Sequence, residues 1–275
     1  MKSFIKDLLI NAAREDYIWS VLKPLSTFGV FLKNARALYE SKHVNPKYKQ
    51  LLFDSLRVQN GPFKGMKYPQ IDAVGSCKYP KLLGTYEKEL WPVIERFKSR
   101  KYSDIVDVGC AEGYYAVGLG LSLKEAKVHA YDINEDGRKL CIQMSRLNNI
   151  EDRILIKAEC TPEDLENFYF GGRGLIICDC EGYEKVLFNH KNLKNLTNCD
   201  LLIETHDSMD IEISSYIKNL FGDTHHVTSL KSIDDIEKAH TYMVDGLEQL
   251  NLYERKEVVS EIRHSTVEWV ICEAK

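Results

Sequence analysis

The sequence predicts an α/β fold built on a mostly parallel, seven-stranded sheet with helices on both faces. Two observations predict it. Seven short apolar segments alternate with helix-like stretches over most of the chain, and such alternation is typical of a parallel sheet that is buried on both faces. In addition, a turn of small residues joins the first of these segments directly to a helix. Open α/β sheets bind nucleotide-like ligands at such turns.

The expected strands and helices follow from these patterns. Strands are expected at 103–108, 127–132, 153–158, 174–179, 199–205, 225–230 and 267–273. Helices are expected between them at 113–122, 135–148, 161–167, 183–189 and 210–220, with a long helical region at 233–262 before the last strand.

The first 97 residues are expected to be largely helical. Residues 1–60 show helical patterns broken near Pro24 and around Asn45-Pro46, residues 61–69 suggest a short hairpin, and 81–97 suggest one helix with an internal proline. The segment 3–38 is amphipathic. We expect it to pack on its own domain or in a homodimer rather than on a membrane surface. Residues 1–80 are therefore expected to form a helical cap region before the α/β domain.

Composition limits the function classes. The 275 residues are 44% hydrophobic and 28% charged, with a net charge of −4, which is ordinary for a soluble globular protein and argues against a nucleic-acid partner. No apolar run is long enough to span a membrane, and the N-terminus lacks the pattern of a signal peptide. The eight cysteines show no CxxC pair, so we expect reduced thiols and a cytoplasmic protein.

The turn of small residues carries the main functional signal. Residues 105–115 read IVDVGCAEGYY. Two tyrosines follow Gly113, whereas a P-loop requires Lys followed by Ser or Thr. A dinucleotide fingerprint would place Tyr114 where a small residue lets the helix pack on the strand. The next expected strand ends in Asp132, at the distance from the turn where an acid binds ribose hydroxyls. The structural alternative is that Asp132 caps the following helix.

The pattern Asp-x-Gly-x-Ala-x-Gly resembles the first motif of class I S-adenosylmethionine-dependent methyltransferases. The resemblance implies a Rossmann-like sheet whose seventh strand inserts antiparallel, over a domain at 81–275 with a helical insertion around 231–262. It also implies contacts from residues 109–114 to the donor's amino acid portion, from Asp132 to its ribose, and from Glu159 to its base; a loop acid is the alternative for Glu159. The implied donor-binding residues are Asp107, Gly109, Cys110, Ala111, Glu112, Gly113, Tyr114, Asp132, Ile133, Glu159 and Asp179.

A second segment, IICDCEGYE at 176–184, resembles the D-x-E-G-x-E signature of the FkbM-type methyltransferases. The match lies at Asp179, Glu181, Gly182 and Glu184, and the segment LIETHD resembles the next strand of that family, with its acid and nearby histidine, His206. The resemblance implies O-methylation of a sugar, nucleotide-sugar or related small molecule in polysaccharide or natural-product biosynthesis. Glu181, Glu184 and Tyr86 would then contact the acceptor.

The chemistry of such a reaction explains why these residue types gather. A sugar hydroxyl is a poor nucleophile at neutral pH, so it needs a base within hydrogen-bond reach or a metal ion that lowers its pKa. His206 is the first choice of base and Asp179 the second. Asp179, Glu204 and His206 would also suit Mg²⁺ or another divalent ion. The structural alternatives are a histidine that orders a loop, and acids at 181 and 184 that favour a helix N-terminus.

Three other functions stay open at this point. They are N-methylation of an amine or peptide, a non-catalytic donor-binding scaffold subunit, and a nicotinamide oxidoreductase, which Tyr114 disfavours. Two histidine-containing pairs look less informative. His225-His226 is expected to be structural because neighbouring strand residues face opposite ways, and Arg263-His264 is expected to be a solvated turn rather than a wall of the acceptor pocket.

Overall fold

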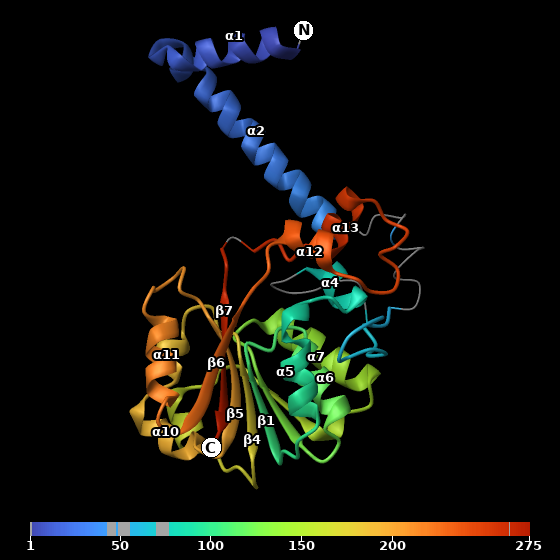
Figure 1. Cartoon of the computed structure of the whole chain (residues 1–275), viewed down its shortest axis with the longest axis vertical. Helices are drawn as coiled ribbons and strands as arrows, with labels where there is room; N and C mark the ends of the chain where they lie inside the picture. The colour runs from blue at the N-terminus through green and yellow to red at the C-terminus, as the bar shows by residue number, and fades with distance from the viewer. Residues whose placement is uncertain (1, 43–47, 49–55, 70–76, 264) are drawn as a thin grey trace. The chain divides into compact units, whose positions relative to one another are not determined.

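The computed structural model describes residues 2–42, 48, 56–69, 77–263 and 265–275. The chain divides into two compact units, Met1–Lys49 and Gln50–Lys275. In the first unit, α1 (Lys2–Arg14) and α2 (Asp16–Lys42) are separate helices (Figure 1). The break predicted near Pro24 is wrong, because α2 continues through this residue. An interior proline removes one backbone hydrogen bond and crowds the preceding turn, at a cost of about 3 kcal/mol, so Pro24 weakens α2 without ending it. The break predicted at Asn45-Pro46 lies outside the described residues.

The second unit is built on a seven-stranded sheet in the order β3-β2-β1-β4-β5-β7-β6. The first five strands in this order are parallel, and β7 is antiparallel to both of its neighbours. This confirms the predicted Rossmann-like fold, including the inserted seventh strand. The strands are β1 (Asp104–Val108), β2 (Lys127–Tyr131), β3 (Ile154–Lys157), β4 (Gly174–Cys178), β5 (Cys199–Thr205), β6 (His225–Lys231) and β7 (Glu268–Ala274).

Helices cover both faces of the sheet (Figure 1). α5 (Trp91–Lys98), α6 (Tyr114–Ser122) and α7 (Glu135–Leu147) lie on one side, and α10 (His190–Leu196) and α11 (Ile213–Phe221) lie on the other. The predicted helices at α6, α7 and α11 are confirmed, as are the short α8 (Pro162–Glu166) and α9 (Glu184–Leu187). α10 was not predicted.

Two long helices expected from the sequence are each interrupted. The stretch 81–97 forms α4 (Lys78–Leu83), a 3₁₀ turn η1 (Lys88–Leu90) and α5. Gly84 ends α4 with a φ of 85°, and a Cβ at this position would lie 2.1 Å from the Asn60 carbonyl oxygen. Pro92 falls in the first turn of α5, where its missing N–H has no cost. The region 233–262 likewise splits into α12 (Asp235–Thr241) and α13 (Leu252–Val259).

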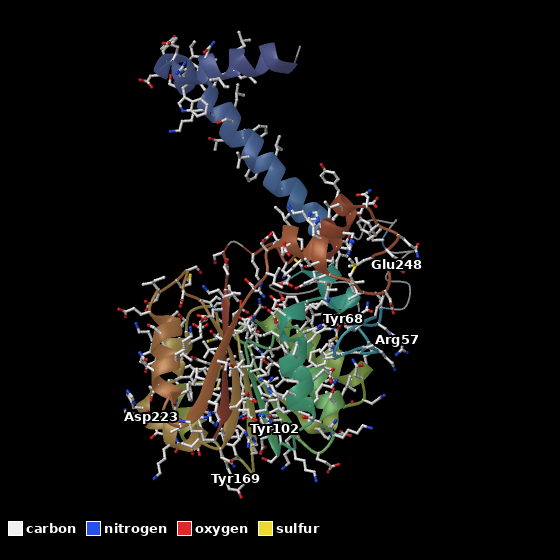
Figure 2. The ribbon with its side chains drawn as sticks, viewed as in Figure 1. Arg57, Tyr68, Tyr102, Tyr169, Asp223 and Glu248 are labelled. Carbon is white, nitrogen blue, oxygen red and sulfur yellow. The ribbon has the colours of Figure 1, made fainter. Side chains whose placement is uncertain are left out.

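A short hairpin-like segment packs on the helix that follows the small-residue turn. Arg57 and Lys67 form an isolated antiparallel bridge, which confirms the predicted hairpin. Figure 2 labels Arg57 and Tyr68, which follows Lys67. Inside it, the ring of Phe63 meets the rings of Tyr114 and Tyr115 edge-on, at centroid distances of 5.1 and 5.9 Å. The segment therefore holds the first turn of α6 in place.

The core of the second unit is largely apolar, and six of the eight cysteines are buried. Every residue of β1, β4 and β5 is buried, and all eight cysteines are free thiols. His225 is buried and bonds the Cys199 carbonyl at 3.0 Å, whereas His226 is exposed. This confirms the structural interpretation of the pair. Among the described helices, none combines the length and the apolar character needed to cross a membrane.

Candidate functional site

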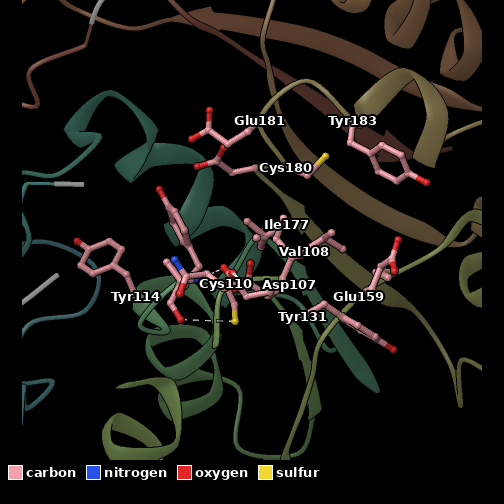
Figure 3. A pocket seen from close by; sticks show the side chains of 18 of the residues that line it. Asp107, Val108, Cys110, Tyr114, Tyr131, Glu159, Ile177, Cys180, Glu181 and Tyr183 are labelled. Carbon is pink, nitrogen blue, oxygen red and sulfur yellow. Dashed lines mark hydrogen bonds between the residues drawn. The ribbon is translucent and has the colours of Figure 1, made fainter. Parts of the chain in front are cut away.

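The register of the sheet brings the predicted site residues together. Val108, at the end of β1, pairs with Tyr131 of β2 and Cys178 of β4, so the residues that follow each strand share one edge. A cavity of about 460 Å³ opens there (Figure 3). Of the residues predicted to bind the donor or acceptor, those that line it are Tyr86, Asp107, Gly109, Cys110, Ala111, Tyr114, Asp132, Ile133, Glu159, Asp179 and Glu181. Glu112 and Gly113 lie in the same turn but do not line the cavity.

The turn after β1 requires glycine because a neighbouring loop approaches it closely. Gly109 has a φ of 85°, and a Cβ there would lie 1.7 Å from the Asp179 carbonyl oxygen. Ala111 also has a positive φ, 46°, a conformation that costs a non-glycine residue roughly 1–2 kcal/mol. Its N–H donates to Asp132 Oδ2 at 2.7 Å. The carboxylate of Asp132 therefore fixes a turn whose exposed backbone faces the cavity.

Asp132 is not the cap of the next helix. Asn134 caps α7, and its side chain accepts hydrogen bonds from the N–H groups of Asp136 and Gly137. Asp132 accepts one N–H from the turn and one from Asn134, the latter at 2.7 Å. Each carboxylate oxygen keeps a second lone pair for a ligand hydroxyl. The position predicted for ribose binding is therefore both rigid and available.

Asp107 is the most buried acid in the cavity wall. It is 2% exposed, and its Oδ2 has no hydrogen-bond partner among the described residues. Burial raises the pKa of this carboxyl to about 8. An uncompensated buried carboxylate is costly unless a cation meets it, so this position suits the ammonium group of an amino acid.

Lys81 is a wall residue that sequence reasoning missed. Its Nζ binds Glu112 Oε1 at 2.5 Å and lies 4.8 Å from the centroid of the Tyr86 ring. The side chain is buried yet lines the cavity. Lys81 comes from the short α4, far from Glu112 in sequence, and nothing in the helix pattern marked it. The cavity wall therefore includes the ammonium group of Lys81, close to the turn that follows Asp107.

His206 and Glu184 form a buried pair at the other end of the site. His206 follows β5, and its Nδ1 lies 2.7 Å from Glu184 Oε1, which also accepts the Gly182 N–H at 3.1 Å. Burial by itself would lower the pKa of His206, but the hydrogen bond to Glu184 and the charge of Asp179 outweigh it and raise the pKa. Glu184 therefore orients the ring and leaves Nε2 to face the acids nearby.

Two acids from the loop after β4 meet His206 Nε2. Asp179 Oδ1 and Glu181 Oε2 each lie 3.5 Å from it. Asp179 Oδ1 has no hydrogen-bond partner among the described residues, and burial together with the charge of Glu181 raises the pKa of Asp179 to about 6, although His206 acts to lower it. The three ligand atoms all lie within 4.8 Å of one another. The types and spacing of these ligand atoms allow them to hold a proton or a cation.

Arg263 organises a buried ion network behind these residues. Its guanidinium binds Glu87 and Glu204, and its Nε donates to Glu261 Oε2 at 2.9 Å. The expectation of a solvated turn at Arg263 is therefore wrong, while His264 lies outside the described residues. Glu204 Oε1 is 4.0 Å from His206 Nε2 and is occupied by Arg263. Burial raises the pKa of Glu204 well above its usual value, so Glu204 is a poor member of the predicted metal set.

The outer wall of the cavity is more exposed. Ile133 is 83% exposed and lines the cavity beside the exposed Glu159 and the half-buried Tyr183. The exposed isoleucine next to Asp132 gives this part of the wall an apolar surface. Tyr183, which the sequence did not indicate, comes from the turn that precedes α9.

Several solved structures are similar to this chain, at low sequence identity and with TM-scores below 0.5. One is the S-adenosylmethionine-dependent O-methyltransferase of Thermotoga maritima, with 10% identity, a TM-score of 0.41, and coverage of 69% of this chain and 66% of that chain. Another is precorrin-6y C5,15-methyltransferase of Geobacter metallireducens, with 10% identity, a TM-score of 0.43, and coverage of 67% and 89%. A third is the precorrin-8w decarboxylase of Methanobacterium thermoautotrophicum, with 14% identity, a TM-score of 0.43, and coverage of 68% and 90%.

Sequence comparison adds no relative to these. No protein-family model matches the chain, and no curated protein matches it. The resemblance to FkbM-type enzymes therefore rests on the motif residues themselves, and the function must be argued from the site.

Proposed function

We propose that this protein is an S-adenosylmethionine-dependent O-methyltransferase that acts on a hydroxyl of a sugar, nucleotide-sugar or related small molecule. One observation carries the proposal. A single cavity joins a glycine turn, whose backbone only Gly109 permits, to an acid at the ribose position and to Asp179 and Glu181, which meet the Glu184–His206 pair. The FkbM-like pattern at 179–184 supports a sugar or natural-product acceptor, with polysaccharide biosynthesis in the cytoplasm as the setting.

The donor fits the cavity from its amino acid end to its base. Asp107 would meet the ammonium group, and Lys81 would meet the carboxylate, since each offers the opposite charge in a buried wall. Asp132 would accept the ribose hydroxyls, and Ile133 and Glu159 would flank the adenine. Both ends of the donor would then be held, so its methyl group would have a fixed position for in-line attack.

The acceptor would be activated by His206. Glu184 holds the Nδ1–H, so a neutral ring presents the Nε2 lone pair to the acceptor hydroxyl. Nε2 of His206 would accept the hydroxyl proton while the bound donor supplied its methyl group to the hydroxyl oxygen, with the electron pair of the carbon–sulfur bond passing to sulfur. Asp179 and Glu181 would bind neighbouring hydroxyls, and Tyr86 would close the opposite wall.

The test is the turnover of His206→Asn with a screened panel of sugar acceptors. We expect kcat to fall by about 10²–10⁴-fold, with donor affinity unchanged, while the exposed His226→Asn serves as the control. Glu184→Gln removes the carboxylate charge and should lower the pKa of His206, moving the acidic limb of the kcat/KM profile to lower pH. Full activity of His206→Asn would contradict the assignment of the base.

A divalent ion is a second way to activate the hydroxyl, and one observation favours it. Asp179, Glu181 and His206 bring three suitable ligand atoms together, and a carboxylate behind a ligating histidine, as Glu184 is here, is a common feature of metal sites. Glu181 therefore replaces Glu204 in the metal set that we expected from the sequence. Calorimetry of Mg²⁺ and Mn²⁺ on donor-loaded protein tests this. Saturable binding that is lost in Asp179→Asn would make His206 a ligand instead of the base.

The remaining alternatives make different predictions. An N-methyltransferase needs no strong base, so His206→Ala and Asp179→Asn would then change little beyond acceptor binding. A scaffold subunit would bind the donor without turnover on any acceptor. This alternative does not explain why Glu184 and His206 form a buried hydrogen-bonded pair. A nicotinamide enzyme would bind NADH in this cavity, so NADH would then compete with S-adenosylhomocysteine in a binding titration.

A further inference from the structure

The first unit of the chain carries an apolar surface that the methyltransferase proposal does not use. Along α2, the large apolar side chains are exposed: Tyr17, Ile18, Trp19, Val21, Leu25, Phe28, Val30, Phe31 and Leu32. Monomeric soluble proteins rarely expose a contiguous apolar surface of this kind unless it binds something. The spacing of these residues shows what they would bind.

A heptad spacing organises the exposed residues of α2. Residues separated alternately by three and four positions are Ile18, Val21, Leu25, Phe28, Leu32 and Ala35, and each of them is exposed. Alternation of three and four is the pattern of a helix that packs along its length against another helix. We call this row the α2 seam. The first two positions of the seam are two heptads before the last two and lie on the same face of α2.

We propose that the α2 seam is a self-association surface, and that it packs against the α2 seam of a second copy of this chain. An isologous contact of this kind needs only one self-complementary surface. Tyr17, Leu22 and Phe31 flank the seam and make the apolar stripe wider than a two-stranded coiled coil requires. A wider stripe suits a bundle in which α1 and α2 of both copies take part.

The area that the seam offers matches what a dimer needs. Tyr17, Phe28 and Phe31 are 82%, 57% and 66% exposed. At about 150–250 Å² for a buried aromatic side chain, these three would supply roughly 300–500 Å² of the about 800 Å² per partner in a stable interface. The four exposed aliphatic residues of the seam, Ile18, Val21, Leu25 and Leu32, would supply most of the rest.

A membrane surface is the competing occupant, and the polar side of α2 argues against it. A helix that lies in a membrane interface has a polar face rich in lysine and arginine. Over residues 16–32, the side of α2 opposite the seam carries Ser20, Lys23, Ser26 and Thr27, with the exposed Trp19 and Val30 among them, so it is not a basic face that a membrane-bound helix would turn to water. The three hydroxyls donate to backbone carbonyls of α2 itself, at 2.7 to 2.9 Å, so they need no lipid headgroup.

Sedimentation equilibrium of the full-length protein tests the proposal with a matched pair of variants. Phe28→Glu places a charge in the seam, and Thr27→Glu places the same charge one residue away on the polar side. We expect a wild-type dimer, an unchanged dimer for Thr27→Glu, and a dissociation constant raised at least about a hundredfold for Phe28→Glu. Near-ultraviolet circular dichroism checks that the α/β unit of each variant is folded.

Three results would overturn the proposal. They are a monomeric wild type at about 100 µM, equal loss of the dimer in both variants, and a dimer that survives Phe28→Glu. Flotation with phosphatidylglycerol vesicles supplies the last comparison. If the wild type is monomeric and binds these vesicles, and Phe28→Glu does not bind them, the seam is a lipid-binding surface instead. None of these readouts depends on methyl transfer.

Discussion

Replacing Gly109 by alanine should damage the fold and the donor site together. A Cβ at this position would lie 1.7 Å from the Asp179 carbonyl oxygen, on a backbone with a φ of 85°. The positive φ costs alanine about 1–2 kcal/mol, and forcing an extra carbon into the contact costs about 1–3 kcal/mol more. Gly109→Ala should therefore lower the free energy of unfolding by about 2–5 kcal/mol, which corresponds to about 4–20 °C in Tm for a domain of this size.

The chain offers a control that separates the two contributions. Gly65 also has a positive φ, 92°, but a Cβ there would have no atom within 4 Å. Gly65→Ala should lose only the conformational part, about 1–2 kcal/mol. Chemical denaturation of both variants measures the difference in their free energies of unfolding. Calorimetry with S-adenosylhomocysteine measures the effect of each substitution on donor binding. Donor binding should weaken at least tenfold in Gly109→Ala and stay unchanged in Gly65→Ala. Equal destabilisation of the two variants would refute the close-contact argument.

Three further predictions follow from the charged residues. Since Asp107 has a pKa of about 8 in the free protein and the donor's ammonium favours its ionised form, S-adenosylhomocysteine should bind up to about tenfold tighter per pH unit between pH 6 and 8. Calorimetry should show this dependence vanish in Asp107→Asn, and a flat wild-type profile would contradict it. Arg263→Met leaves Glu87 and Glu204 buried without their cation and should cost about 3–5 kcal/mol in urea unfolding; a loss below about 1 kcal/mol would argue against the network. Lys81→Met should raise the donor Kd about tenfold or more by removing a charged partner of the carboxylate, and an unchanged Kd would place the carboxylate elsewhere.

The sheet could be predicted from the sequence because its strands are almost wholly apolar and short turns separate them from helices. β1, β4 and β5 are buried along their full length, so β4 appears as a continuous apolar run and β1 and β5 as apolar segments interrupted by a few buried acids. The predicted helix boundaries were wrong where the backbone conformation of a single residue mattered more than the periodicity of the apolar residues. The positive φ at Gly84 divides the stretch 81–97, whereas Pro24 does not end α2.

The site could be predicted mainly where its residues follow strands directly. Asp107, Asp132 and Asp179 lie at or just beyond the ends of β1, β2 and β4, and the parallel register brings them to one edge. Lys81 and Arg263 reach the same region from the short α4 and from an irregular segment after α13. No period or spacing connects such segments to the sheet, so only the folded structure shows which charges meet.

Calorimetric titration of the purified full-length protein with S-adenosylhomocysteine tests the central claim most directly. The account predicts saturable binding of one ligand per chain, with a Kd of about 1–100 µM, strongly weakened in Asp132→Ala and not displaced by NADH. Absence of binding to the folded protein, or binding of NADH in its place, would contradict a methyl-donor site at the edge of this sheet.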